Sequence, residues 1–251
     1  MNSKSEIQDD QPGSPQTNKK PPRMVQRISF TVFIGLVIIA IIPAILMSVW
    51  PVLSPERLPS PWSGALFHTV MLIFSLLFIG IFGRLKFKEY GFRLPGSFRP
   101  IPGIITGILL GAVATILAVL LPGEGEQNMP GQDMSFFEVI LFIWIYASLA
   151  EEVLCRGLIQ GYLNPFNNYR LTLLSVKLSL PVITGALFFA LMHLALLTTG
   201  VSIWPVVIIV IFALLLGLMA GYQLERTSSL LSAVLIHMSF NMGGSIAEFL
   251  L

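Results

Sequence analysis

Residues 136–160 read FFEVILFIWIYASLAEEVLCRGLIQ, and this stretch decides how the rest of the chain is interpreted. It has the length of a membrane-crossing helix, which needs about 20 mostly apolar residues. It also carries Glu151 and Glu152 side by side. An ionisable group at the centre of a membrane costs at least ~2.5–3.5 kcal/mol, so such groups persist where they pair or take part in function. The stretch therefore predicts a membrane helix that holds a polar site.

Similar apolar runs make up most of the 251 residues, of which 55% are hydrophobic and only 11% are charged. Soluble domains average about 25% charged residues, so this composition excludes an ordinary soluble domain. The runs lie at residues 28–50, 64–83, 101–121, 136–160, 181–198, 203–224 and 228–250. We predict an all-α fold, a polytopic transmembrane helix bundle of about seven spans. The expected location is that of an integral, multi-pass protein of a bacterial cell membrane.

The chain divides into a polar tail and one membrane domain. The first 23 residues are polar and rich in Pro, and we predict a disordered cytoplasmic tail over residues 1–27. Residues 28–251 are predicted to form a single transmembrane helical domain, with its functional core in about 136–250. Lys and Arg concentrate in the tail and in every second loop between the runs. This alternation places the N-terminus on the cytoplasmic side.

The two adjacent glutamates differ in what their own helix offers them. Glu152 and Arg156 are four residues apart, so they share a helix face and can form an ion pair. Glu151 points about 100° around the helix from Glu152 and finds no cation on its own helix. We therefore expect Glu152 and Arg156 to organise the site, and Glu151 to need a partner on another helix, a proton or a bound water.

Two later runs carry one histidine each in their interiors. Phe189 precedes His193 by four residues, and Asn241 follows His237 by four residues, so each pair shares a helix face. Counted from the cytoplasmic ends at ~1.5 Å per residue, Glu151, His193 and His237 lie at depths of roughly 14–18 Å. Upright helices would thus bring them into one layer. A single membrane histidine is as often a satisfied interhelical hydrogen bond, and that interpretation remains open for each of them.

A carboxylate, two imidazoles and an amide have the parts needed for hydrolysis. Glu151 with His193 can hold and deprotonate a water, and His237 with Asn241 can stabilise an oxyanion. Alternatively, Glu151, His193 and His237 could ligate a divalent metal such as zinc, with water in the fourth position. No cofactor is certain, since spacing does not distinguish the metal-bound from the metal-free site.

Two further residues are assigned no chemical role. His68 lies near the outer end of its predicted span, away from the layer, and we predict a structural or interfacial residue. Cys155 has no base beside it in the sequence, which favours a buried, inert thiol over a nucleophile.

Three motifs in this order, Glu151-Glu152-xxx-Arg156, Phe189-xxx-His193 and His237-xxx-Asn241, resemble the CAAX protease and bacteriocin-processing (CPBP) family of intramembrane endopeptidases. This family is related to type II CAAX prenyl endopeptidases. The resemblance covers about residues 136–245 and places the catalytic core there. It implies that Glu151 and His193 activate the water and that His237 and Asn241 stabilise the oxyanion. Glu152 and Arg156 would organise the site. The family has been described both as metalloproteases and as glutamate proteases, so the metal question stays open.

The expected partners are a membrane-anchored or lipidated peptide substrate and the lipid bilayer, with no nucleic acid. Nothing in the sequence shows that the substrate is prenylated. Two other function classes remain as alternatives. One is a non-enzymatic membrane scaffold or peptide-immunity protein that keeps the fold. The other is a proton-coupled transporter, which the lack of inverted repeats disfavours.

Overall fold

The computed structural model describes residues 24–45, 48, 60–96, 99–120, 134–173 and 175–251. The predicted disorder of residues 1–23 lies outside these ranges. Residues 24–27, predicted to lie in the tail, belong instead to the first helix, α1 (Met24–Leu36). That helix continues without a break into the π-helical segment η1 (Val37–Ile41).

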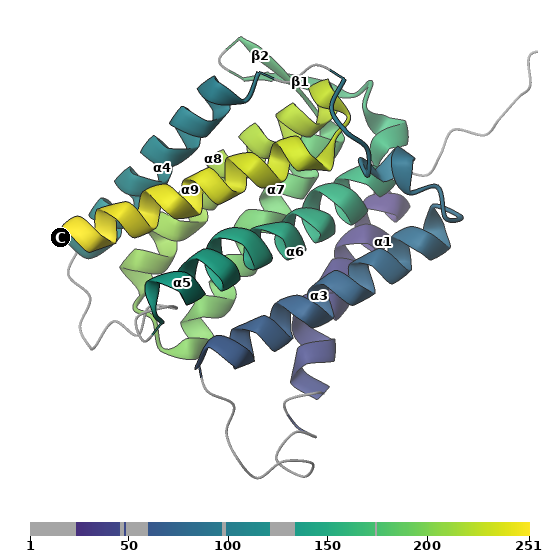
Figure 1. The fold of residues 1–251 in the computed structure, drawn as a ribbon. Coiled ribbons are helices and arrows are strands. Elements are labelled where there is room, and N and C mark those ends of the chain that lie inside the picture. The colour runs from purple at the N-terminus through teal and green to yellow at the C-terminus, as the bar shows by residue number, and fades with distance from the viewer. Residues whose placement is uncertain (1–23, 46–47, 49–59, 97–98, 121–133, 174) are drawn as a thin grey trace, which may run out of the picture.

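Helices make up nearly all of the described chain, as predicted for an all-α bundle. Figure 1 shows them as a bundle of long rods. After α1 and η1 the long elements are α3 (Ser60–Phe82), α4 (Pro100–Leu120), α7 (Leu180–Met192) with η6 (His193–Thr199), α8 (Ile203–Thr227) and α9 (Leu230–Leu250). Short 3₁₀ turns, η2 (Phe87–Tyr90) and η5 (Asn164–Phe166), lie in the connections.

Six helices in the described residues are long and apolar enough to cross a membrane: Met24–Ile45, Trp62–Phe82, Pro100–Leu120, Leu180–Thr199, Ile203–Thr227 and Leu230–Leu250. They coincide with six of the seven predicted spans. The predicted fourth span, residues 136–160, is helical throughout but is not one of these six. It contains Glu138, Glu151, Glu152 and Arg156, which are the charges that set it apart. In Figure 1 this rod lies in the middle of the bundle, between α3 and α9.

The backbone of residues 136–160 alternates between α-helical and π-helical turns. The order is α5 (Phe136–Glu138), η3 (Val139–Ala147), α6 (Ser148–Glu152) and η4 (Val153–Gln160). Wide π turns are rare and are frequently found at functional sites. Glu151 and Glu152 are the last two residues of α6, so they sit between two π-helical segments. The apolar pattern of the sequence does not predict this alternation.

Helices α4 and α9 approach each other more closely than ordinary side chains would allow. A Cβ added at Gly111 would collide with the carbonyl oxygen of Phe240, and one added at Gly243 would collide with that of Ile108. Small residues permit this kind of close backbone packing between membrane helices. The contact fixes the part of α9 that carries Asn241, the residue after Phe240.

One small sheet departs from the all-α expectation. Strands β1 (Arg170–Leu173) and β2 (Val176–Ser179) form an antiparallel hairpin, with Arg170 opposite Ser179. The Oγ atom of Ser179 then accepts a hydrogen bond from the backbone N–H of Val182 at 3.4 Å, which caps α7. Pro181 follows in the first turn of α7, where a missing N–H does no harm. The hairpin therefore determines where the helix that leads to His193 begins.

Candidate active site

The predicted ion pair between Glu152 and Arg156 is present. Oε1 of Glu152 lies 3.1 Å from Nη1 of Arg156, and both side chains are fully buried. The guanidinium carbon of Arg156 also lies 4.5 Å from the centroid of the Phe189 ring, within cation–π range. The nitrogens of Arg156 nevertheless have no well-aligned hydrogen bond among the described residues. The contact is thus a close ion pair supported by an aromatic face.

His237 on α9 connects the two glutamates. Its Nδ1 atom lies 2.9 Å from Oε1 of Glu152, and its Nε2 atom lies 3.5 Å from Oε2 of Glu151. Because a carboxylate oxygen accepts, the Nδ1 atom carries the hydrogen in the bond to Glu152. The ring is buried, with 3% of its surface exposed. His237 is therefore held by one carboxylate while its other nitrogen faces the second.

Glu151 finds its partners on other helices, as its position on the helix predicted. One partner is His237 and the other is His68 of α3, whose Nε2 lies 3.4 Å from Oε1 of Glu151. The prediction that His68 lies away from this layer was wrong. The depth estimate assumed upright helices with their ends in a common plane, whereas real membrane helices tilt and long side chains extend along the membrane normal.

His193 begins the 3₁₀ segment at the end of α7, and its ring is half-buried. Nδ1 lies 2.8 Å from the carbonyl oxygen of Phe189 and must donate, because a carbonyl can only accept. In a neutral ring this leaves Nε2 with a lone pair that can take a proton from water. Within the described chain no direct hydrogen bond or ion pair joins His193 to Glu151.

Phe189 is the aromatic centre of the cluster. Its ring contacts that of His193 edge-to-face at 4.9 Å between centroids, and that of His237 at 5.3 Å. The same ring supports Arg156, and only 1% of Phe189 is exposed. The phenyl ring of Phe189 in α7 therefore contacts residues from η4, η6 and α9. Its spacing to His193 predicted only one of these contacts.

Asn241 also lies on this side of α9, and both hydrogens of its amide nitrogen have acceptors. Nδ2 lies 3.1 Å from the carbonyl oxygen of Ile143 and 3.0 Å from Oγ of Ser148. Both acceptors belong to the 136–160 run, so Asn241 ties α9 to the helix that carries the glutamates. Cys155 is buried, as predicted.

The carboxylate of Glu151 and the imidazoles of His193 and His237 are side chains of the kinds that bind metal ions. All three histidines direct Nδ1 towards an oxygen acceptor, an arrangement that also orients metal-bound imidazoles. Among the residues that the structure describes, however, no group of three or more His, Cys, Asp or Glu side chains is positioned to hold a metal ion.

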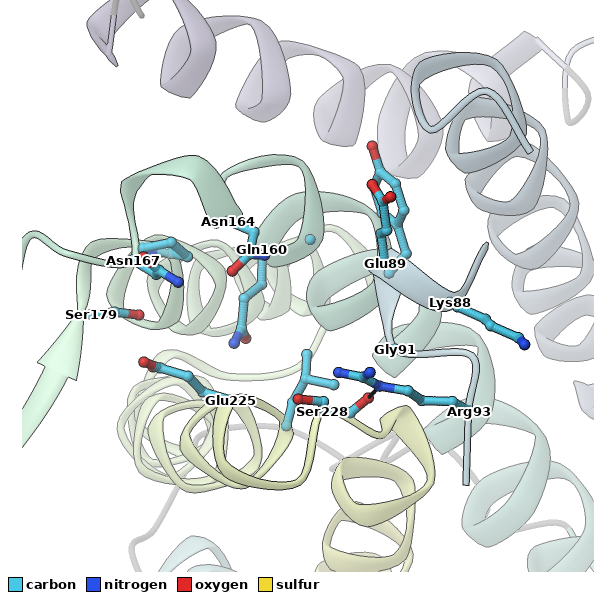
Figure 2. A pocket seen from close by; sticks show the side chains of 14 residues that line it. Lys88, Glu89, Gly91, Arg93, Gln160, Asn164, Asn167, Ser179, Glu225 and Ser228 are labelled. Atoms are coloured by element: carbon cyan, nitrogen blue, oxygen red, sulfur yellow. Dashed lines mark hydrogen bonds between the residues drawn. The ribbon is translucent and has the colours of Figure 1, made fainter. Parts of the chain in front are cut away.

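A separate polar cavity of about 210 Å³ lies where the loop after α3 meets the ends of η4 and α8. Figure 2 shows its lining, which includes Lys88, Arg93, Gln160 and Glu225. Arg93 is anchored there, since its Nε donates to the carbonyl oxygen of Ser228 at 2.7 Å. None of the predicted site residues lines this cavity. We therefore place the candidate active site not at this cavity but at Glu151, where the carboxylate contacts the imidazoles of His68 and His237.

Comparison with known proteins gives one family match. Residues 133–243 match the model of a family described as type II CAAX prenyl endopeptidase Rce1-like. The matched segment contains all seven predicted site residues and excludes His68. No curated protein and no solved structure matches the chain.

Proposed function

Because residues 133–243 match the type II CAAX prenyl endopeptidase Rce1-like family, we propose that this integral, multi-pass membrane protein is an intramembrane endopeptidase. It would hydrolyse a peptide bond in a membrane-anchored or lipidated peptide. The observation that carries the proposal is the position of Glu151, a partly exposed carboxylate whose two oxygens face imidazole nitrogens inside the helix bundle.

The first step of the proposed reaction is activation of water. The carboxylate of Glu151 accepts a proton from a water molecule, and Nε2 of His193 accepts a hydrogen bond from the same water. The Nδ1–H of His193 is already committed to the Phe189 carbonyl, which leaves Nε2 as the accepting atom. The resulting hydroxide attacks the carbonyl carbon of the scissile peptide bond.

The second step is collapse of the tetrahedral intermediate. With its Nδ1–H bound to the Glu152 carboxylate, a His237 ring that carries both hydrogens would donate from Nε2 to the oxyanion. For Asn241 to donate as well, its Nδ2 must exchange a present contact, such as the one with Ser148. The carbon–nitrogen bond then breaks, and Glu151 returns its proton to the leaving amine. Glu152 and Arg156 hold His237 and Phe189 in place throughout.

The test is cleavage of lipid-anchored peptides by the purified protein in liposomes, with products identified by mass spectrometry. The expected result is a defined cleavage that Glu151→Gln and His193→Ala abolish. Glu138→Gln is the matched control, since Glu138 lies on the same helical run but forms a capping box with Ser135 that a Gln can also make.

Repeating the assay with a metal chelator distinguishes a metalloprotease from a glutamate protease, the two descriptions given to the family. Cleavage that continues after chelation supports a water activated by Glu151 and His193 without a metal, whereas cleavage that chelation stops and only added zinc restores identifies a metal enzyme. Products that persist in Glu151→Gln overturn the proposal and leave a scaffold or immunity role as the remaining account.

A further inference from the structure

We propose that His68 of α3 is a positioning residue that orients the carboxylate of Glu151 for the reaction. This inference rests on the proposed function, because it assigns His68 a role in that same hydrolysis. His68 lies outside the segment 133–243 that matches the family, and it comes from a different helix than any other residue of the cluster. The site would then depend on α3 as well as on the matched segment.

The ring of His68 is fixed by its own helix. Its Nδ1 atom lies 2.9 Å from the carbonyl oxygen of Gly64, one turn earlier on α3, and must donate to it. His193 makes the same contact with the carbonyl four residues before it. In both rings the bond to the backbone limits rotation, so Nε2 points in a set direction. In His68 that direction is towards Glu151, to which Nε2 donates when the ring carries both hydrogens.

The carboxylate of Glu151 is held symmetrically. Oε1 lies 3.4 Å from Nε2 of His68, and Oε2 lies 3.5 Å from Nε2 of His237. Both distances exceed a normal N–H···O hydrogen bond of about 2.7–3.2 Å, as catalytic contacts often do before substrate binds. With one imidazole at each oxygen, the carboxylate cannot rotate without leaving both partners. Without His68, Oε1 of Glu151 would lose its imidazole partner.

The residues on either side of His68 in the sequence make contacts of their own. Thr69, the next residue on α3, shares a hydrogen bond of 2.6 Å with the hydroxyl of Tyr146 in η3. The ring of Phe67 lies edge-to-face against that of His68 at 5.5 Å, and the side chain of His68 is only 16% exposed. Helix α3 therefore contacts the 136–160 run at a second point besides the contact of His68 with Glu151.

Three variants separate a positioning role from mere packing. His68→Phe keeps a flat ring and removes Nε2. His68→Gln keeps an amide nitrogen that can reach a similar position. Thr69→Val is the matched control, because it breaks the Tyr146 contact on the same helix turn and leaves Glu151 untouched. All three are compared with wild type for kcat, KM and melting temperature in detergent.

Misplacing a catalytic group lowers turnover by about 10- to 100-fold. We expect a loss in this range for kcat of His68→Phe with little change in KM, partial recovery in His68→Gln and near wild-type kcat in Thr69→Val. Wild-type kcat in His68→Phe would overturn the proposal. The proposal would also be overturned if kcat fell in proportion to melting temperature, and to the same extent, in His68→Phe and in Thr69→Val.

A failure of the proposed function is recognised separately, because wild type would then cleave nothing, or Glu151→Gln would cleave as wild type does. In that case the melting temperatures of His68→Phe, Glu151→Gln and the double variant decide. If the melting-temperature shift of the double variant differs from the sum of the two single shifts, His68 and Glu151 interact as proposed. A shift equal to that sum overturns the proposal.

Discussion

The ring of His237 is bound to Glu152 through a 2.9 Å contact between Nδ1 and Oε1, and the same oxygen lies 3.1 Å from Nη1 of Arg156. One buried carboxylate thus holds a histidine from another helix and neutralises the arginine of its own helix. Glu151, the residue before it, is left to face Nε2 of His237 and the site. In the proposed mechanism Glu152 therefore holds His237 and Arg156, and Glu151 is the carboxylate that acts on the water.

Glu152→Gln should destabilise the protein, because it leaves the fully buried guanidinium of Arg156 without its counter-ion. Breaking a buried pair from one side typically costs about 3–5 kcal/mol. The measurement is thermal unfolding in detergent. Glu152→Gln/Arg156→Met should recover part of the loss, since it removes the buried charge as well.

The exposed pair of Lys86 and Glu89, whose nitrogen and oxygen lie 3.3 Å apart, provides the control for this prediction. Glu89→Gln should leave the unfolding temperature nearly unchanged, because water screens exposed pairs. If Glu152→Gln lowered the unfolding temperature as little as Glu89→Gln, the buried pair of Glu152 and Arg156 would not stabilise the protein.

Phe189→Leu should lower both stability and kcat, because the phenyl ring contacts two imidazoles and the guanidinium at once. The matched control is Phe188→Leu. Phe188 is also buried, but its ring packs against Gly35 of α1, away from the site. We expect both variants to unfold at lower temperature and only Phe189→Leu to lose turnover beyond what the loss of folded protein explains. Equal effects on kcat would contradict the account.

Gly111→Ala should disrupt the close contact of α4 and α9, since the added Cβ would collide with the backbone of Phe240. The neighbouring Asn241 would then shift relative to Ile143 and Ser148, and activity should fall together with melting temperature. Gly80→Ala on α3 is the control, because its Cβ would make only ordinary contacts, at 3.4 Å from Leu85 and 3.6 Å from Phe87. Alanine in a helix interior is favoured over glycine by about 0.5–1 kcal/mol, so this variant should be as stable as wild type or more so. A harmless Gly111→Ala would show that the two helices can separate freely.

Much of the bundle could be predicted from the sequence because each membrane helix needs its own long apolar run. Six predicted spans correspond to helices that meet the length and hydropathy of a span, and the remaining predicted span, residues 136–160, is helical but more charged. The pairing of Glu152 with Arg156 was predictable because both residues lie on one helix, where a spacing of four residues implies a shared face.

Contacts between helices were harder to predict. Those of His237 with Glu152 and of His68 with Glu151 depend on tilt and on side-chain reach, which an estimate of depth along straight rods does not contain. The π-helical turns on either side of α6 have no counterpart in the apolar pattern. Nor does the sequence show that the amide of Asn241 is engaged by Ile143 and Ser148.

The central claim is that Glu151 activates the water, and the most direct measurement is the single-turnover cleavage rate of wild type and Glu151→Gln on one lipid-anchored peptide. The amide keeps the size of the side chain but cannot accept the proton. A general base contributes about 10²- to 10⁴-fold, so the account predicts a loss of that size at an unchanged melting temperature and unchanged peptide binding. Cleavage by Glu151→Gln at the wild-type rate would contradict it.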